Sequence, residues 1–396
     1  MAQSKATGPC AGLQVVDFTT MVAGSLAGQN LGDYGADVIK IEPLSGEMVR
    51  HFEPIHDGMS AHFLQHNRNK RSIALNLKTP EGGEIARALA SRADVVLENS
   101  RPGVMDRLGL GPSHLQALND KLVYVSINGF GPTGPYAQRP AYDHLLQGLV
   151  GAMVMQGQGG PPQPIYNAIA DKITAVVATH AALAALYHRE KSGGQGQHVS
   201  VSMLDAFATF FLSDQMYRYA FHDVEGLNMP TGKNYFPIAT NDGHVIGMIA
   251  SDQQFKAGCE TFGAEELLAD TRFATMSDRI ANLEEMWAEL AKFAANISTA
   301  EALRRAETHD LPLAPIQDVT RFFDDPQVHH NGTIVDIPDP EFGTVRQLGH
   351  PARFEHTPML DYSRAPRLNE HESEILKNLG YSDDQIAQLK VQGAIG

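Results

Sequence analysis

The fold is decided by three consecutive pieces near the start of the chain: Leu13-Gln-Val-Val-Asp-Phe-Thr19, the stretch 21–35, and Asp37-Val-Ile-Lys-Ile-Glu42. The outer two are short β-rich runs, and the middle piece has the pattern of a helix. This helix carries glycines four residues apart, at Gly24, Gly28 and Gly32, so that one face allows close packing. The glycines do not lie in the turn directly after the strand, so they do not match the dinucleotide fingerprint.

The alternation of strand and helix continues to residue 130. Further strands are expected over 71–77, 94–99 and 122–127, with a helix over 79–93 that Thr79-Pro80 opens. This pattern predicts the α/β class, with a doubly wound parallel sheet. Ligands bind beyond the carboxyl ends of such strands. The segments expected to carry the site are 19–23, Glu42, 99–101 and 128–131.

The later chain mixes loops, helices and a second set of strands. Helices are expected over 141–153, from Asp171 at its head to about 191, and from 204; a strand is expected over 196–203. A second, smaller α+β unit is expected from about residue 225, with a hairpin at Asn241-Asp-Gly243 and helices over 253–308. Short strands and a final helix near 370–379 are expected to complete the chain.

Composition excludes several classes of partner. The chain has 396 residues, 43% of them hydrophobic and 19% charged, with a net charge of −15. That charge argues against nucleic acid or an anionic membrane as partner. We expect no membrane span and no secretory signal. Cys10 and Cys259 match no metal or redox spacing, so a reduced, cytoplasmic protein without a metal is expected.

Asp171 is the candidate for covalent chemistry. It lies at the head of a long alanine-rich helix that ends with His188-Arg-Glu-Lys191. The positive end of the helix dipole favours an ionised carboxylate there, and the apolar surroundings leave it poorly solvated. The alternative is an ordinary N-cap or first-turn aspartate.

The densest basic cluster is Arg68-Asn-Lys70-Arg71, with Arg101 and Arg107 next. In an acidic chain such a cluster can supply a local site for a phosphorylated ligand. The alternative is a solvated face.

Several motifs together carry a family resemblance. They include Leu31-Gly-Asp-Tyr-Gly-Ala-Asp-Val-Ile-Lys-Ile-Glu42, Leu77-Lys-Thr-Pro-Glu-Gly82, Arg101-Pro-Gly103, Gly129-Phe-Gly131 and Ser192-Gly-Gly-Gln-Gly-Gln197. In this order, over nearly the whole chain, they resemble the family III CoA-transferases. The resemblance implies an interlocked homodimer, with a large CoA-binding domain from residues 1–222 and 326–396 and a small domain from 223–325.

The resemblance also implies a reaction and a set of site residues. Asp171 matches the family's nucleophile, which would carry CoA as a thioester between an acyl-CoA donor and a carboxylic acid acceptor. Pro43 replaces an arginine that some members carry, and Thr231-Gly232-Lys233 is the candidate for a glycine-bearing loop over the site. The positions that match contacts with coenzyme A are Val22, Ala23, Asn69, Lys70, Arg71, Asn99, Arg107, Asn128, Gly129 and Phe130.

Two other functions compete with CoA transfer. The related α-methylacyl-CoA racemases pair the aspartate with a histidine, but Tyr142 stands where that histidine would align, and His144 follows two places later. Tyrosine is a poor base at neutral pH, so transfer is favoured. The second alternative is a non-catalytic CoA-binding protein. Four histidines crowd one segment and are candidates to receive the acceptor carboxylate: His51, His56, His62 and His66. His62 and His66 have the i, i+4 spacing of a helical metal pair, but no third ligand accompanies them.

Overall fold

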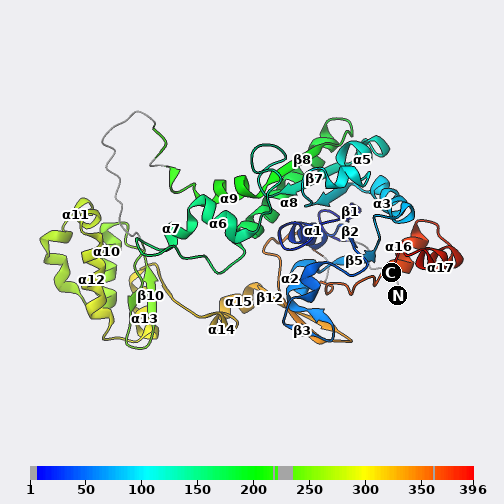
Figure 1. The fold of residues 1–396 in the computed structure, drawn as a ribbon. Coiled ribbons are helices and arrows are strands. Elements are labelled where there is room, and N and C mark those ends of the chain that lie inside the picture. The colour runs from blue at the N-terminus through cyan, green and yellow to red at the C-terminus, as the bar shows by residue number, and fades with distance from the viewer. Residues whose placement is uncertain (1–6, 217–218, 222–234, 360–361) are drawn as a thin grey trace. The chain divides into compact units, whose positions relative to one another are not determined.

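The computed structural model describes residues 7–216, 219–221, 235–359 and 362–396. It contains two compact units: Met1–Ala220 with Gly332–Gly396, and Phe221–Asn331 (Figure 1). The domain bounds expected from the sequence, after residues 222 and 325, lie close to these. That each unit folds as a domain by itself stays a prediction.

The first unit is built on a six-stranded sheet in the order β5-β2-β1-β6-β7-β8. All five neighbouring pairs are parallel, which confirms the predicted α/β class. The strand order reverses between β1 and β6, and this is where open α/β sheets bind ligands. The strands are β1 (Gln14–Asp17), β2 (Asp37–Glu42), β5 (Lys70–Ala74), β6 (Val95–Glu98), β7 (Val123–Asn128) and β8 (His198–Ser202).

Helices cover both faces of this sheet because successive strand residues point to opposite sides. Val15 and Val95 belong to one core, with α1 (Ala23–Asp33), α8 (Ile169–Lys191) and α9 (Met203–Phe211). Val16 and Val96 belong to the other core, which the remaining sheet-covering helices complete. These are α3 (Pro80–Arg92), α5 (Pro112–Leu118), α16 (Glu372–Asn378) and α17 (Asp383–Val391).

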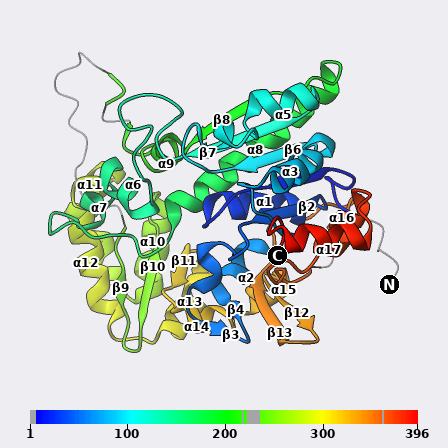
Figure 2. The ribbon, with the colours of Figure 1, turned by 45° about the vertical axis from the view of Figure 1, so that its right-hand side comes forward.

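The two ends of the chain meet in the second core. Leu75, at the end of β5, forms a bridge with Ile395, and both side chains are buried. Figure 2 shows α16 and α17, in red, beside the blue N-terminal strands. The helix α17 was not expected from the sequence, although Ser382 and Gln385 form a capping box at its start.

The glycine face of α1 packs against the sheet. A Cβ on Gly24 would lie 2.4 Å from the Thr19 side chain, and one on Gly28 would lie 2.7 Å from a carboxylate oxygen of Asp17. The glycines therefore let α1 approach the end of β1 and the charged groups beneath it.

The helix expected over 141–153 is broken. Gly151 adopts φ 87°, a left-handed conformation, and ends α6 (Asp143–Val150) before α7 (Ala152–Gln156) begins. Glycine tolerates this conformation, which a sequence pattern of apolar residues does not reveal.

Among the described residues, the helix α8 is long and apolar enough to cross a membrane by length and composition alone. In the structure its small residues face the core, where Ala170, Ala175, Ala178 and Ala182 are buried. It makes its most extensive helix contact with α1.

Shorter elements complete the first unit. The helices are α2 (Ala61–Asn67) and α4 (Val104–Arg107), with a 3-10 turn at Met48–His51. The strands are paired in two antiparallel ribbons, β3 (Ile55–His56) with β4 (Met59–Ser60) and β12 (Ile334–Asp339) with β13 (Gly343–Leu348).

The second unit has its own core around Trp287. The expected hairpin at 241–243 is confirmed, because Thr240 N donates to Gly243 O at 2.9 Å. Its strands are β9 (Ile238–Ala239), β10 (His244–Gly247) and β11 (Leu313–Pro315), which pair antiparallel. Its helices are α10 (Asp252–Phe262), α11 (Met276–Ala281), α12 (Leu283–Ala294), α13 (Thr299–His309), α14 (Val319–Phe322) and α15 (Pro326–Asn331).

Candidate active site

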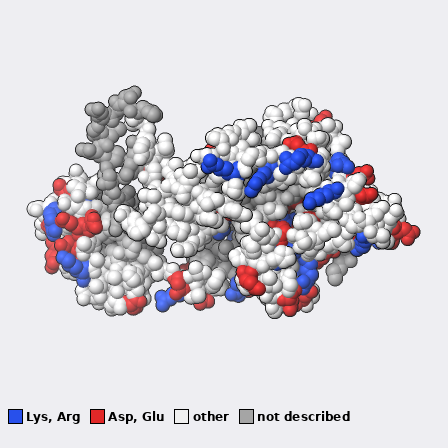
Figure 3. Space-filling view, viewed as in Figure 1, with Lys and Arg blue, Asp and Glu red and all other residues white. Residues whose placement is uncertain are grey.

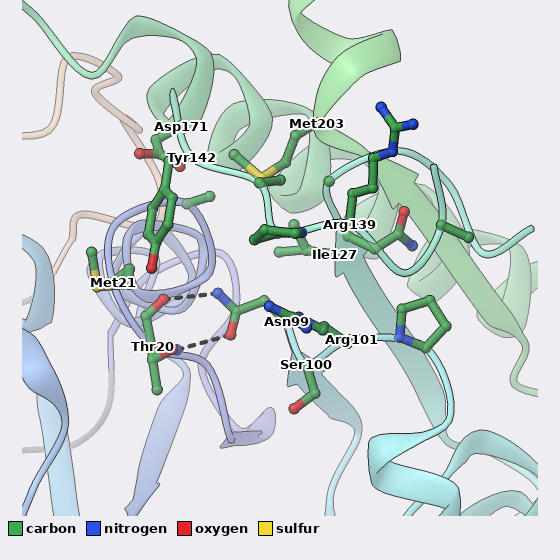
Figure 4. A pocket seen from close by; sticks show the side chains of 17 residues that line it. Thr20, Met21, Asn99, Ser100, Arg101, Ile127, Arg139, Tyr142, Asp171 and Met203 are labelled. Atoms are coloured by element: carbon green, nitrogen blue, oxygen red, sulfur yellow. Dashed lines mark hydrogen bonds between the residues drawn. The ribbon is translucent and has the colours of Figure 1, made fainter. Parts of the chain in front are cut away.

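A cavity of about 320 Å³ lies beyond the carboxyl ends of β1, β6 and β7. Its walls come from the segments that follow these strands, from the loop before α6, and from the start of α8 (Figure 4). Asp171 lines this cavity together with Thr20, Met21, Asn99 and Asn128. The parallel sheet thus brings residues from four distant stretches of sequence to one site.

Asp171 lies in the first turn of α8 but does not cap it. The cap comes from another helix: Asp143, the first residue of α6, accepts hydrogen bonds from Ala170 N at 2.6 Å and Asp171 N at 3.2 Å. The negative charge of Asp143 therefore occupies the donors at the start of the helix. The Asp171 side chain is left without that stabilisation.

Gln147, one turn further along α6, fixes the segment that leads into α8. Its side-chain amide accepts from Ile165 N at 2.9 Å and donates to Asn167 O at 3.1 Å. It also donates to Asp143 Oδ1 at 2.5 Å. Because Gln147 is buried, these bonds hold both the cap and the approach to Asp171 in place.

The Asp171 carboxyl group is harder to ionise than an ordinary aspartate. Burial raises its pKa from 3.8 to about 7, the negative charge of Asp143 raises it as well, and Lys172 acts in the opposite direction. The helix dipole was expected to favour the ionised form, but the net shift runs toward the neutral form. The expected poor solvation is confirmed and outweighs the dipole.

Asn99 joins the ends of β1 and β6. Its side chain accepts from Thr20 N at 2.9 Å and donates to Thr20 O at 2.8 Å, as Figure 4 shows. Both polar atoms of the amide are thus engaged with the backbone. Asn99 shapes the wall of the cavity through this clamp.

The loop after β7 contacts the loop before α6 very closely. An added Cβ on Gly129 would lie 2.2 Å from Cβ of Ala141, so this position requires glycine. Asn128 accepts from Gly131 N at 2.5 Å and fixes the same turn. The Phe130 side chain contacts Tyr136 instead, with the two ring centroids 5.7 Å apart.

Two arginines supply positive charge to the cavity. Arg101 and Arg139 both line it, and neither forms an ion pair with any residue that the structure describes. The Arg139 guanidinium lies 3.9 Å from the ring centroid of Tyr136. Figure 3 shows Lys and Arg side chains in a row over the region of β7 and β1, in a chain whose net charge is −15.

Comparisons with known proteins identify the family of the chain. A model of CoA-transferase family III matches residues 10–372. The chain belongs to CoA-transferase family III. It is 34% identical over 384 residues to the succinate–glutarate CoA-transferase of Agrobacterium fabrum, covering 94% of this chain and 96% of the relative. It is also 34% identical to the formyl-CoA:oxalate CoA-transferase of Escherichia coli, covering 98% and 99%.

Solved structures share the fold. A CaiB/BaiF family protein from Brucella suis superposes with a TM-score of 0.83 and 36% identity, covering 94% of this chain and all of that one. A hypothetical protein from Mycobacterium tuberculosis superposes with a TM-score of 0.82 and 30% identity, covering 94% and 100%. The protein is therefore a CoA-transferase, and the racemase alternative is not favoured.

The basic cluster of this CoA-transferase lies elsewhere and is neutralised within the fold. Lys70 is buried, and its ammonium donates to Asp17 Oδ2 and Asn67 Oδ1, both at 2.8 Å, and to Ser25 O. Arg68 is paired with Asp33, while Arg71 is paired with Asp37 at the amino ends of the strands. Asn69 bonds Asp33 and Ser363. None of the four lines the cavity, so their contact with CoA stays a prediction.

A second cavity continues from the first, because Thr20 and Ser100 line both. It runs over the carboxyl ends of β2 and β5, past Pro43, with apolar walls that include Leu44, Leu77 and Met105. Lys78, which was not among the residues predicted to contact CoA, adds a positive charge to this cavity. Its position just after a strand was the available signal. Arg107, the last residue of α4, does not line this cavity, although Met105 and Leu108, on either side of it in the sequence, do.

The remaining sequence candidates are divided between the cavity and other parts of the chain. Tyr142 lines it, but the exposed His144 does not, and its ring stacks on Tyr142 with centroids 6.2 Å apart. Val22 precedes α1 and Ala23 lines the cavity. Two of the crowded histidines, His62 and His66, line a separate cavity. The segment Thr231-Gly232-Lys233 lies outside the described residues.

Proposed function

We propose that this CoA-transferase moves CoA from an acyl-CoA to a free carboxylic acid by way of a covalent thioester at Asp171. The observation that carries the proposal is the position of Asp171. Asp171 lines a cavity at the switch point of the sheet, and its carboxyl group is poorly solvated. A desolvated carboxylate is a stronger nucleophile than one in water.

The proposed route keeps an activated acyl bond at every step. The Asp171 carboxylate attacks the donor thioester, which forms a mixed anhydride and releases CoA thiolate. The thiolate attacks the aspartyl carbonyl, which gives the Asp171 thioester and releases the donor acid. The acceptor carboxylate then attacks this thioester, and the freed thiolate attacks the acceptor side of the new anhydride. This yields the new acyl-CoA and restores Asp171.

The fold supplies groups for the charges that develop on this route. The backbone N–H groups in the first turn of α1 have no side-chain cap, and Ala23 places them at the cavity wall. We propose that they, with the Gly129 backbone, stabilise the oxyanions. The N–H groups at the start of α8 cannot do so, because Asp143 occupies two of them.

We propose that CoA lies along the two joined cavities. The thioester end would lie beside Asp171, and the adenosine end would lie between the apolar side chains of the second cavity. Lys78 in the second cavity and Arg101 in the first suit the phosphate charges of CoA. Arg139 suits either a phosphate or the acceptor carboxylate.

The protein is also proposed to act as a homodimer. Several large apolar side chains on α6, α7 and α9 are exposed, among them Leu149 at 52%, Val154 at 64% and Phe210 at 53%. Apolar surface of this kind is typical of protein interfaces. Light scattering on the purified protein measures its mass, and a monomer at working concentration would contradict this part of the proposal.

Turnover and trapping test the reaction itself. The enzyme is incubated with succinyl-CoA, glutaryl-CoA or formyl-CoA and with free succinate, glutarate or oxalate, the acids in the names of its relatives. We expect Asp171→Ala to lose CoA transfer by at least about 1000-fold while it still binds CoA. Hydroxylamine is expected to trap an Asp171 hydroxamate in the wild type, detected by mass spectrometry.

Two results would contradict the mechanism. Full activity in Asp171→Ala would exclude an aspartyl intermediate. Exchange of the α-proton of a 2-methylacyl-CoA into deuterated solvent, without any acceptor acid, would indicate the racemase instead. A protein that binds CoA and turns over none of the tested pairs would favour the non-catalytic alternative.

A further inference from the structure

A buried ion pair lies directly behind the turn that joins β1 to α1. Lys40 Nζ lies 2.9 Å from Glu47 Oε1, and neither side chain has any exposed surface. Removing both charges from water is unfavourable unless the remaining hydrogen-bonding capacity is used. The partners that use this capacity therefore indicate what the pair does.

Both members of the pair bond the backbone of the same turn. Lys40 Nζ donates to Thr19 O at 2.8 Å, and Glu47 Oε2 accepts from Met21 N at 2.7 Å. The pair thus bridges the two backbone groups on either side of Thr20. Thr20 itself is held from the other direction by the Asn99 clamp.

Glu47 is in turn fixed by a second ion pair. Glu42 Oε1 accepts from Glu47 N at 3.1 Å, and Arg50 binds both carboxylate oxygens of Glu42 at 2.7 Å. Burial alone would lower the pKa of Lys40, but the carboxylates of Glu47, Asp17 and Glu42 raise it above its ordinary value. The amine therefore remains a cation inside the fold.

The turn needs such support because Met21 is in an unfavourable conformation. Its φ is 65°, in the left-handed region that residues other than glycine rarely adopt. Met21 lines the cavity next to Thr20 and Ala23, and Figure 4 shows Met21 and Thr20 across from Asp171. A shift of this turn would move the start of α1 relative to the nucleophile.

We propose that Lys40 and Glu47 are positioning residues for CoA transfer, which hold the turn at 19–21 so that the start of α1 stands opposite Asp171. The proposal rests on the proposed function for its effect on rate. We call the Lys40–Glu47 pair, with its bonds to the turn at 19–21, the brace. It is a property of the free protein. Its two parts can therefore be measured separately.

The experiment compares three variants with the wild type. Glu47→Gln keeps the shape of the side chain but removes the charge that holds Lys40. The double variant Lys40→Met with Glu47→Met removes both charges, so that no lone charge stays buried. Arg189→Met is the matched control, because Arg189 is also buried and paired, with Asp94, but its hydrogen bonds go to Lys121 O and Glu190 and not to the turn at 19–21.

Hydrogen exchange, kcat and KM are measured for each folded variant. We expect both brace variants to exchange amides of residues 19–23 at least about 10-fold faster and to lose about 10- to 100-fold in kcat, with a change in KM for the acyl-CoA below about 3-fold. Arg189→Met is expected to keep wild-type exchange in this segment and wild-type kcat. Asp171→Ala is expected to lose turnover with unchanged exchange at 19–23, which separates this proposal from the proposed nucleophile.

Three results would overturn the proposal. The first is wild-type exchange at 19–23 in both brace variants, and the second is faster exchange with wild-type kcat. The third is failure of both variants to fold while Arg189→Met folds, which would make the pair purely structural.

Discussion

Asp171 shows how the surroundings of a residue can reverse what its place in a helix suggests. The first turn of a helix normally favours a carboxylate. Here Asp143 takes the backbone donors and adds a second negative charge, so the pKa of Asp171 rises to about 7. The sequence could identify the candidate and its apolar setting. It could not show the second carboxylate, which lies 28 positions away in the chain.

This pKa predicts the pH dependence of the reaction. Only the ionised carboxylate attacks a thioester, so kcat/KM is expected to rise with pH through about 7. Asp143→Asn removes one cause of the raised pKa while its amide oxygen can still cap α8. We expect the rising limb of the profile to move down by about 0.5 to 1 pH unit.

The pH dependence of kcat/KM for Gln147→Glu serves as a control. The opposite shift is expected because this substitution adds a negative charge beside Asp143. Its rising limb is expected to move up. An unchanged limb in both variants would mean that a group other than Asp171 controls the rate.

Asp171 is also expected to reduce stability above neutral pH. Its folded pKa lies above the ordinary 3.8, so the fold favours the neutral form: the penalty is absent below about 3.8, grows as pH rises and is complete above about 7. Asp171→Asn is therefore expected to raise the free energy of unfolding by about 2 to 4 kcal/mol at pH 8 and by much less at pH 4. Denaturant titrations followed by circular dichroism measure this difference.

Asp205→Asn is the control for that titration, since Asp205 occupies the first turn of α9 on the surface. It is expected to change stability little at either pH. Equal stabilisation by Asp171→Asn at pH 4 and pH 8 would refute the electrostatic explanation.

At the scale of elements, the sequence predicted the strands and helices whose signals lie in the local sequence pattern. The parallel strands and α3 agree with expectation within a few residues, and Thr79 caps α3 as its position indicates. The break at Gly151 was missed, because the apolar pattern runs through it. The Arg68 cluster was expected to be free for a ligand, but it is paired with acids from β1, β2 and α1 that only the fold brings near.

The contact between the loops after β7 and before α6 gives a prediction at this scale. Gly129→Ala places a methyl group against Ala141, so the loops must separate and Asn128 must shift. We expect a loss of about 1 to 3 kcal/mol in stability and of about 10-fold in kcat.

Two further variants show whether that contact is the cause. Gly148→Ala, in the exposed face of α6, has no neighbour closer than 3.9 Å and is expected to be neutral or slightly stabilising. Ala141→Gly is expected to rescue Gly129→Ala. Failure of the rescue would place the defect in the backbone of Gly129 and not in the contact.

At the scale of the whole chain, the hydrophobic cores of the two units share no residue. The single tryptophan of the sequence, Trp287, is buried in the core of the second unit. Tryptophan fluorescence is therefore expected to report the unfolding of that unit alone, while circular dichroism reports both.

Asp171→Asn makes this separation measurable. At pH 8 it is expected to shift the part of the dichroism transition that belongs to the first unit and to leave the fluorescence midpoint unchanged. A shift of both midpoints by the same amount would mean that the two units unfold together, against the domain prediction.

The cap that Asp143 places on α8 has a consequence for the energy of the reaction cycle. Two acids share the start of one helix, and only Asp143 is compensated by backbone donors. On the proposed route, Asp171 becomes an uncharged mixed anhydride or thioester, so the repulsion between the two acids ends when the intermediate forms. The free enzyme would then carry an electrostatic repulsion that the covalent intermediate does not, so forming the intermediate would stabilise the fold. The loaded protein should accordingly melt at a higher temperature than the free one.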